Sequence, residues 1–326
     1  MFAYFLRRLG QSVITVIVMA MLVFIGVYAI GNPIDILINP EATERERMEA
    51  MMRLGLDKPL WEQFLSYFTN LLRVDFGNSF VYGRSAMEVI LQRLPATMEL
   101  ALFALVLAVC LGIPLGVIAG LRPDTIGGRS IMTGSILGFS LPNFWQGLML
   151  ILIFAVVLGW LPAGGRGTTT EIFGLRVSFL TLDGLKHMIL PAINLALFKM
   201  ALVIRLARAG TREVIMQDYI KFARAKGLSA RRVVLVHVLK NIMIPVVTIL
   251  GLELGSMIAF AVVTETVFSW PGMGKLLIDS INRLDRPVIV AYLMLIVFIF
   301  VIINFLVDLL YTVLDPRVRI AQRGAQ

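Results

Sequence analysis

The chain has 326 residues, of which 58% are hydrophobic and 16% are charged, with a mean hydropathy of +0.86 and a formal net charge of +9 at pH 7. One soluble core of this length cannot bury so many apolar side chains, so the composition excludes a soluble globular domain and indicates an integral membrane protein. Membrane topology and attraction to anionic lipid explain the basic excess, and no nucleic-acid-binding motif accompanies it. The lone Cys110 excludes an internal disulfide framework.

Apolar windows of about 20 residues, long enough to cross roughly 30 Å of hydrocarbon, recur along the chain. They are continuous rather than alternating, which favours helices over barrel strands. We therefore predict an all-α membrane protein. Its six transmembrane helices are expected at 9–30, 97–120, 131–158, 188–205, 242–263 and 288–313.

The predicted spans divide the chain into an N-terminal anchor (1–30), an external helical insert (31–95), a transmembrane core (96–313) and a tail (314–326). The first span reads as an uncleaved anchor, because its apolar run exceeds a signal-peptide core and no A-x-A site follows. If both termini face one side, that side holds 16 basic and 4 acidic residues, and the other side holds 13 basic and 14 acidic residues. The positive-inside rule then places both termini in the cytoplasm.

The external insert contains two segments, 41–56 and 60–79, with apolar residues at helical spacing. Asp57 is expected to cap the second helix. Two interpretations remain open for the insert: a lid that only covers the membrane surface, or a docking surface for an external partner. The candidate docking stripe consists of Trp61, Phe64 and Phe68.

The cytoplasmic loop 206–241 carries strong helix signals. Asp218 suits a helix N-cap, Gly227 suits the position after the last turn, and Ser229 suits the cap of a second helix. A short amphipathic helix at this place either lies on lipid headgroups or fits a groove on a soluble partner. Its expected apolar face is formed by Tyr219, Phe222 and Ala223.

Three residues inside the predicted spans are notable. Glu253 lies near the middle of the fifth span, where a carboxylate is costly. It either lines a path or contacts a partner subunit, or it is a hydrogen-bonded structural residue. Lys199 is expected to snorkel toward the inner boundary, and Pro142 is expected to kink the third span.

Motifs for catalysis and cofactor binding are absent from the sequence. "PGMGKLL" lacks the spacing and the Ser/Thr of a P-loop, and no G-x-S-x-G occurs. Neither His187 nor His237 has a second His or Cys at metal-ligand spacing. We therefore predict no catalytic residue, no bound cofactor and no metal, and we interpret His237 as a loop-packing residue.

Several longer motifs occur in a fixed order. The cytoplasmic loop reads "ARAKGL" and then "HVLKNIMIP". The insert holds "LGLDKPLWEQF" and "DFGNSF", and later segments read "SLPNFWQGLMLILIFAVVLGWLPAGG", "TETVFSWPGMGKLL" and "NFLVDLLYTVLDPRVR". Over nearly the whole chain, this pattern resembles the inner-membrane permease subunits of ABC importers, in particular the dipeptide/oligopeptide group. The loop departs from the general Glu-Ala-Ala start, because Lys221, Phe222 and Ala223 stand there.

The resemblance implies a permease subunit of an ATP-driven importer in a bacterial or archaeal inner membrane, forming half of a path for peptides or peptide-like solutes. The implied partners are a homologous second permease, two cytoplasmic ATPase subunits that use ATP and Mg, and an external solute-binding protein. Glu253 is the candidate path residue. The implied ATPase-coupling residues are Asp218, Tyr219, Phe222, Ala223, Ala225, Lys226, Gly227, Leu228 and His237.

The resemblance leaves the substrate open among dipeptides, oligopeptides, glutathione, nickel chelates, opines and sugars. The main alternative function is a secondary transporter or channel that works without ATP. Such proteins usually contain inverted repeats with paired broken helices, and the two halves of this chain show no matching Gly/Pro interruptions. Dependence of transport on ATP would separate the two functions.

Overall fold

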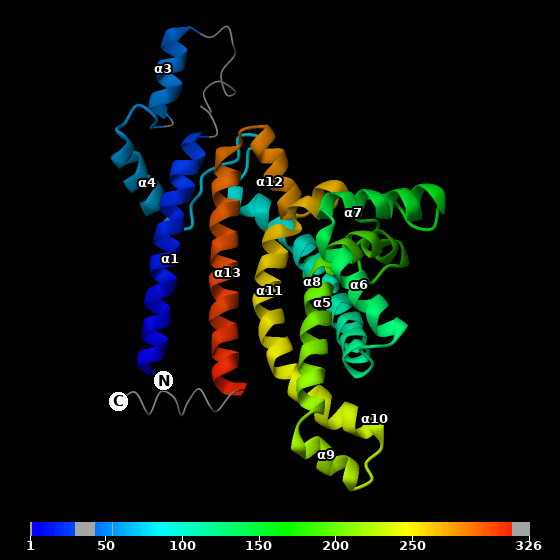
Figure 1. Ribbon diagram of the computed structural model, residues 1–326. Helices are drawn as coiled ribbons and strands as arrows, with labels where there is room; N and C mark the ends of the chain where they lie inside the picture. Colours follow the sequence, from blue (N-terminus) through cyan, green and yellow to red (C-terminus); the bar gives the residue numbers. More distant parts are fainter. Residues whose placement is uncertain (1, 30–42, 54, 315–326) are drawn as a thin grey trace. The chain divides into compact units, whose positions relative to one another are not determined.

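The computed structural model describes residues 2–29, 43–53 and 55–314, and most of them are helical (Figure 1). Contacts within the chain divide it into two compact units. Unit 1 comprises Met1–Thr97 and Pro271–Ile302, and unit 2 comprises Met98–Trp270 and Ile303–Gln326. The domain boundaries expected from the sequence fall elsewhere and stay a prediction.

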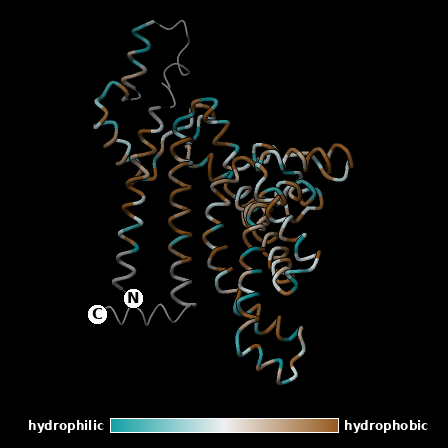
Figure 2. The backbone as a smooth tube through the Cα atoms, viewed as in Figure 1, coloured by the Kyte–Doolittle hydropathy of each residue, from teal (hydrophilic) through white to brown (hydrophobic). Residues whose placement is uncertain are grey.

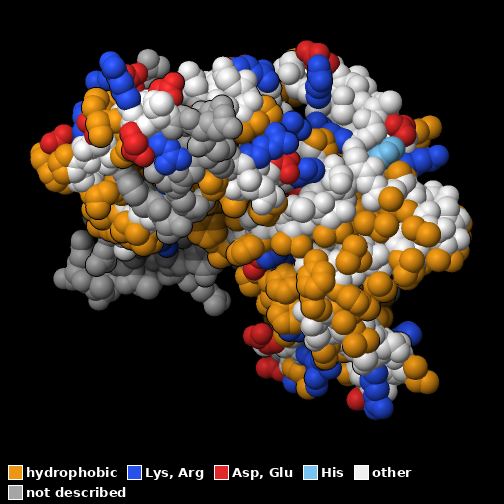
Figure 3. All heavy atoms as spheres, turned by 90° about the horizontal axis from the view of Figure 1, so that it is seen from above, with side chains coloured by type: hydrophobic (Ala, Val, Ile, Leu, Met, Phe, Trp, Pro, Cys, Tyr) orange, Lys and Arg blue, Asp and Glu red, His pale blue; other side chains and the backbone are white. Residues whose placement is uncertain are grey.

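Five helices in the described part of the chain are long and apolar enough to cross a membrane. Hydrophobic residues run along most of their length (Figure 2). Many large apolar side chains remain exposed on the surface (Figure 3), as expected of helices that face lipid. These observations confirm a helical membrane protein. The five helices are α1 (Phe2–Ala29), α5 (Ala86–Leu121), α8 (Leu182–Ile215), α11 (Leu239–Val267) and α13 (Arg286–Leu314).

The third predicted span is broken rather than continuous. Its first half is α6 (Ile126–Ser140), and its second half is α7 (Asn143–Leu150) followed by the π-helical η1 (Ile151–Val157). The two halves meet at 109°. Pro142 lies at the break, so the predicted kink is confirmed but is far sharper than an ordinary proline kink.

Gln146 stabilises this break. Its Nε2 donates to the carbonyl oxygens of Gly138 at 2.7 Å and Leu141 at 2.8 Å. Pro142 has no N–H to donate to the Gly138 carbonyl four residues earlier, and Gln146 replaces that donor. The side chain is nearly buried, with 7% of its surface exposed.

We expect Gln146→Leu to destabilise the protein, because it leaves part-buried carbonyl groups without a donor, at about 1–3 kcal/mol for each group. The matched control is Gln92→Leu, which removes an exposed glutamine that bonds only to Glu88 within the same helix. Thermal unfolding in detergent should show a lower midpoint for Gln146→Leu alone. Equal midpoints for the two variants would contradict the role given to Gln146.

In unit 2, α5 packs closely on α8 through three glycines spaced four residues apart. A Cβ on Gly116 would lie 2.6 Å from Ala207 Cβ, and one on Gly120 would lie 2.7 Å from Thr211 Cβ. Gly112 similarly approaches Val203. Small residues at this spacing allow helix backbones to approach within a membrane.

We expect Gly116→Ala to destabilise the α5–α8 pair, because the added methyl would also meet the Ile204 carbonyl oxygen of the α8 backbone at 2.6 Å. Overpacking of this kind typically costs about 1–3 kcal/mol. Gly134→Ala on α6 adds the same methyl where no heavy atom lies within 4 Å, so it should be neutral or mildly stabilising. Thermal unfolding of both variants tests the difference, and a stable Gly116→Ala would rule out the tight contact.

Unit 2 also contains a short antiparallel hairpin, which departs from the predicted all-α class. Strand β1 (Thr170–Ile172) pairs with β2 (Leu175–Val177). Phe173 and Gly174 form the turn with φ values of 50° and 78°, and two positive φ angles are typical of a type I′ hairpin turn. The segment after α8 comprises α9 (Asp218–Ala225), α10 (Ala230–Arg232) and the π-helical η2 (Val233–Val238).

Unit 1 contains the two helices predicted in the insert, α3 (Glu44–Arg53) and α4 (Leu60–Leu72), and also α12 (Met273–Asn282). At the start of α3, Thr43 donates its backbone N–H to Glu46 Oε2 at 2.8 Å, which lowers the pKa of that carboxyl.

The α4 helix begins after Pro59 and has no side-chain cap, so the predicted cap by Asp57 is wrong. Pro59 fills the cap position with its fixed φ, which leaves Asp57 outside the helix. The core of unit 1 joins Val23 of α1 to Ile289 of α13, with Tyr67 of α4 packed against it.

Candidate coupling and translocation site

Helix α9 is attached to unit 2 by one buried face. Ile220 is completely buried and Ala223 is 6% exposed. Both belong to a hydrophobic cluster that includes residues of α5, α8 and α11, so the buried face of α9 is packed into the same core as these helices. In Figure 1, α9 and α10 lie together beyond the ends of α8 and α11. The other cluster members are Ile113, Val117, Val203, Ala207, Val214, Val233, Val238, Ile242, Val246 and Leu250.

The opposite side of α9 presents aromatic side chains to solvent. Tyr219 is 45% exposed and Phe222 is 62% exposed. Lys226 Nζ lies 4.5 Å from the centroid of the Phe222 ring, and Ala225 is exposed beside it. The face predicted from helical spacing is therefore divided, since Ala223 points into the bundle while Tyr219 and Phe222 point outward.

The N-terminus of α9 differs from the prediction by one residue. Gln217 is the N-cap, and Asp218 is the first helical residue. Asp218 accepts a hydrogen bond from Lys221 Nζ at 2.9 Å, and this contact holds the pKa of the Asp218 carboxyl below its ordinary value. Both side chains are highly exposed, so the pair adds little to stability.

The C-terminus of α9 is closed by Gly227, as predicted. Its φ of 80° is left-handed, its N–H donates to the Arg224 carbonyl at 2.9 Å, and the Leu228 N–H donates to the Ala223 carbonyl at 3.3 Å. These two bonds define a Schellman cap, and Leu228 packs against the buried cluster. A Cβ on Gly227 would have no heavy atom within 4 Å, so the surface there is open in this chain.

The chain then leads into α11. Ser229 caps α10 by accepting a hydrogen bond from the Arg232 N–H at 3.4 Å, which confirms its predicted capping role. His237 is half-buried in η2, and its carbonyl accepts a hydrogen bond from Asn241 Nδ2 at 2.6 Å. Within the described residues, no group of three or more His, Cys, Asp and Glu side chains is placed to hold a metal ion.

Glu253 on α11 forms an ion pair with Lys199 on α8. Lys199 Nζ also donates to Ser256 Oγ at 2.8 Å. Lys199 is 9% exposed, so the expectation that it snorkels to the boundary is wrong. The Glu253 carboxylate within the bundle is its partner instead of the lipid headgroups. The two residues carry opposite charges in consecutive predicted spans, but the sequence alone does not show that these helices face each other.

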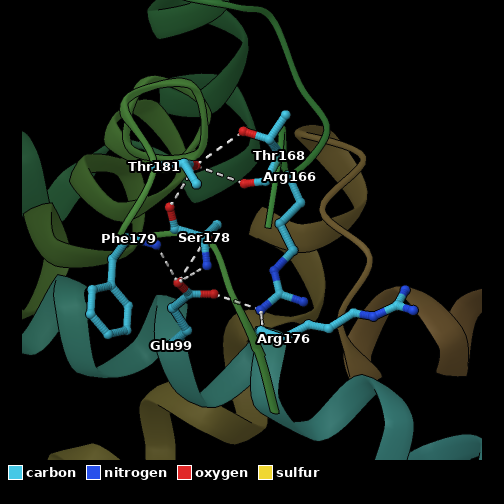
Figure 4. Close-up of polar contacts among 7 residues, drawn as sticks. All are labelled: Glu99, Arg166, Thr168, Arg176, Ser178, Phe179 and Thr181. Carbon is cyan, nitrogen blue, oxygen red and sulfur yellow. Dashed lines mark hydrogen bonds and ion pairs between the residues drawn. The ribbon is translucent and has the colours of Figure 1, made fainter. Parts of the chain in front are cut away.

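Glu99 on α5 is the centre of a polar network that sequence analysis missed (Figure 4). Glu99 Oε1 accepts from Ser178 N at 2.6 Å, Ser178 Oγ at 2.9 Å and Phe179 N at 2.8 Å. Arg166 Nη2 donates to Glu99 Oε2 at 2.7 Å and to the Arg176 carbonyl at 2.5 Å. The network therefore holds the hairpin and the loop before it against α5.

A second polar group joins α7, α8 and α11. Asn194 Nδ2 donates to Asn143 Oδ1 at 2.5 Å and to Thr264 Oγ1 at 3.0 Å. Asn194 and Thr264 are almost fully buried. This group links the broken third span to the two helices that flank the cytoplasmic loop.

The predicted docking stripe in unit 1 is only partly available. Phe64 packs against Phe24 of α1, with ring centroids 5.3 Å apart, and Phe68 stacks on Phe64 at 6.1 Å. Trp61 is 63% exposed. Trp61 is therefore the member of the stripe that a partner would reach first.

Two family profiles match the chain. Residues 112–320 match "Binding-protein-dependent transport system inner membrane component", and residues 1–101 match "Binding-prot-dependent transport system membrane comp, N-term".

Individual proteins agree with these profiles. The chain is 40% identical to the di/tripeptide transport system permease protein DppB of Pseudomonas aeruginosa (strain UCBPP-PA14), over 98% of this chain and 99% of the relative. It is 38% identical to the dipeptide transport system permease protein DppB of Escherichia coli (strain K12), with the same coverage. A chain of the MetNI methionine ABC transporter in inward-facing conformations superposes with a TM-score of 0.53 at 14% identity, over 70% of this chain and 97% of that chain, which supports the fold.

Proposed function

Because the chain belongs to the family of binding-protein-dependent transport system inner membrane components, we propose that it is the permease subunit of an ATP-driven ABC importer of peptides or peptide-like solutes. The names of its relatives, a di/tripeptide and a dipeptide permease, support this substrate class. The chain supplies half of the translocation path, and Glu253 is one of its residues.

The structural observation that carries the proposal is the two-sided character of α9. Ile220 and Ala223 anchor the helix in the bundle, while Tyr219 and Phe222 face solvent. An exposed aromatic face on a short helix fits a groove in a soluble protein. Force applied there reaches α5, α8 and α11 through the buried cluster, so α9 acts as the coupling lever.

The energy for import comes from partner subunits. The chain has no P-loop of its own, so ATP and Mg are used by two cytoplasmic ATPase subunits, one of which docks on α9 of this chain. Closure of these subunits on ATP shifts the bundle between inward-open and outward-open states. No cofactor is bound by this chain itself.

The topology follows from the basic cytoplasmic loop. If α6, α7 and η1 together cross the membrane once, the chain has six spans and both termini lie in the cytoplasm with loop 206–241. With a re-entrant bent pair and a cytoplasmic N-terminus, this basic loop would lie outside, against the positive-inside rule. We therefore assign six spans in a bacterial or archaeal inner membrane.

The exposed part of the insert is assigned to docking of the external binding protein or the second permease. We expect Trp61→Ser to weaken assembly or solute delivery several-fold without destabilising the chain, because Trp61 is largely exposed. Phe64→Ser is the comparison, since it removes the contact with Phe24 and should lower the thermal midpoint. If Trp61→Ser assembled and took up solute as the wild type does, the docking role would be contradicted, and the insert would be interpreted as a lid on the membrane surface.

The assembly itself provides the test of the proposal. The chain should copurify with a homologous permease and two ATPase subunits, as a pseudo-twofold heterodimer on an ATPase pair. Native mass spectrometry of the complex extracted in mild detergent measures this composition. A stable monomer with neither kind of partner would refute it.

A further inference from the structure

Unit 2 carries a continuous row of charged and aromatic side chains on its membrane helices, which we call the aromatic–cation strip. It begins with the Glu253–Lys199 ion pair. Lys199 Nζ lies 5.2 Å from the centroid of the Phe198 ring, and Phe198 stacks on Phe139 of α6 with centroids 4.6 Å apart. Arg205 Cζ lies 4.9 Å from the centroid of the Phe139 ring and ends the strip.

The strip is accessible from outside unit 2. Phe198 and Phe139 are each 42% exposed, and Arg205 is also exposed. Phe198 is the exposed aromatic residue of α8 beside the buried Lys199. Charged side chains in a membrane-spanning segment normally face a watery path or the interior of a bundle rather than lipid. An exposed strip that carries charges is therefore suited to the wall of an aqueous path.

The charges of the strip are not balanced. Glu253 is neutralised by Lys199, whereas Arg205 has no carboxylate partner among the residues that the structure describes. An arginine beside an aromatic ring presents several N–H donors in a fixed plane, a geometry suited to a carboxylate. The adjacent stacked rings offer an apolar surface to the rest of a solute.

We propose that the aromatic–cation strip lines the solute path, and that Arg205 together with Phe139 and Phe198 receives the carboxylate end of a passing peptide. This inference rests on the proposed function and adds a specificity-determining residue to it. Affinity at such a site is weak, because an exposed cation is largely solvated. Weak binding also suits a path that must release its solute.

Thiol labelling of the assembled complex in nanodiscs tests whether the strip is in water. The native Cys110, exposed on α5 in the middle of a span, is the control. The test variant is Cys110→Ala/Phe198→Cys. Thiolates react in water, so a charged methanethiosulfonate reagent should label the cysteine at 198 at least about tenfold faster than Cys110. Equal labelling rates at position 198 and at Cys110 would indicate that the strip faces lipid or a partner, and would overturn the proposal.

The charge of the reagent tests the role of Arg205. We expect the sulfonatoethyl reagent to be favoured over the trimethylammonioethyl reagent at position 198, and Arg205→Gln to lower that ratio by roughly threefold or more. Arg205→Lys should keep most of the preference. Arg212→Gln removes an exposed charge further along α8 and should leave the ratio unchanged. An unchanged ratio in Arg205→Gln would refute anion selection.

A dipeptide at millimolar concentration should slow labelling at position 198, whereas its C-terminally amidated form should not. Equal protection by the two forms would contradict recognition of the carboxylate. Labelling requires neither ATP nor uptake. ATP-dependent uptake without charge-selective labelling would therefore refute this inference and leave the proposed function standing. Charge-selective labelling in a complex that does not import solute would refute the proposed function alone.

Discussion

Replacing Gly227 with valine is expected to lower the rate of solute uptake more than tenfold, while the chain still inserts and assembles its membrane helices. Gly227 has a φ of 80°, and a β-branched residue in that conformation costs about 1–2 kcal/mol. The strain opens the Schellman cap that orients α9, and the new side chain projects into open space, where the proposed function places the docked ATPase subunit. Uptake and solute-stimulated ATP hydrolysis in proteoliposomes measure the effect.

Gly227→Asn separates the two causes. Asparagine tolerates a left-handed backbone, so this variant keeps the cap but still adds a side chain. Loss of coupling in both variants indicates a filled contact, and loss in the valine variant alone indicates a disturbed cap. A helix that merely rests on lipid predicts that neither matters. Full uptake by Gly227→Val in an intact complex would exclude the lever.

Removing Lys199 alone is expected to destabilise the protein strongly. Lys199→Met leaves Glu253 without its cation inside the membrane, and breaking a buried ion pair costs about 3 kcal/mol or somewhat less for this part-exposed carboxylate. The thermal midpoint in detergent should fall by roughly 5 °C or more. The double variant Lys199→Met/Glu253→Gln has no unpaired charge and should recover most of the loss.

Lys221→Met provides the matched control for this pair. It removes a lysine from an ion pair with Asp218 that is almost fully exposed, so the thermal midpoint should not change. If Lys199→Met were as stable as Lys221→Met, the intramembrane ion pair would have no structural importance. If the double variant were less stable than Lys199→Met, coupling between the two charges would be excluded.

The features that sequence analysis predicted are those encoded locally. Continuous apolar runs reveal the membrane helices, because the requirement to cross hydrocarbon acts on each segment separately. The cap residues Gly227 and Ser229 likewise act within a few residues of their own position, and both were placed correctly. The shift from Asp218 to Gln217 at the N-cap lies within the usual uncertainty of helix ends.

The features that were missed depend on residues far apart in the sequence. The hairpin at 170–177 is too short to give a periodic signal, and it is held against α5 by contacts from Glu99 to Arg166 and Ser178. Pro142 predicted a kink, but the sequence did not predict its angle of 109° or the hydrogen bond by which Gln146 replaces the missing donor.

The candidate site shows the same division between local and distant information. Helical spacing found the exposed Tyr219 and Phe222 but overlooked Ile220, whose burial depends on residues of α5, α8 and α11. Glu253 was recognised because a carboxylate in the membrane costs free energy. Its partner Lys199 was expected to snorkel, because residue spacing alone does not show which spans face each other.

The most direct test of the account is solute uptake by the purified complex in proteoliposomes, with the external binding protein present and ATP enclosed on the cytoplasmic side. We predict concentrative uptake of a dipeptide that requires ATP hydrolysis, stops when the ATPase subunits are omitted, and is lost with Gly227→Val. Uptake by this chain alone, without ATP or ATPase subunits, would contradict the account and identify an ATP-independent transporter.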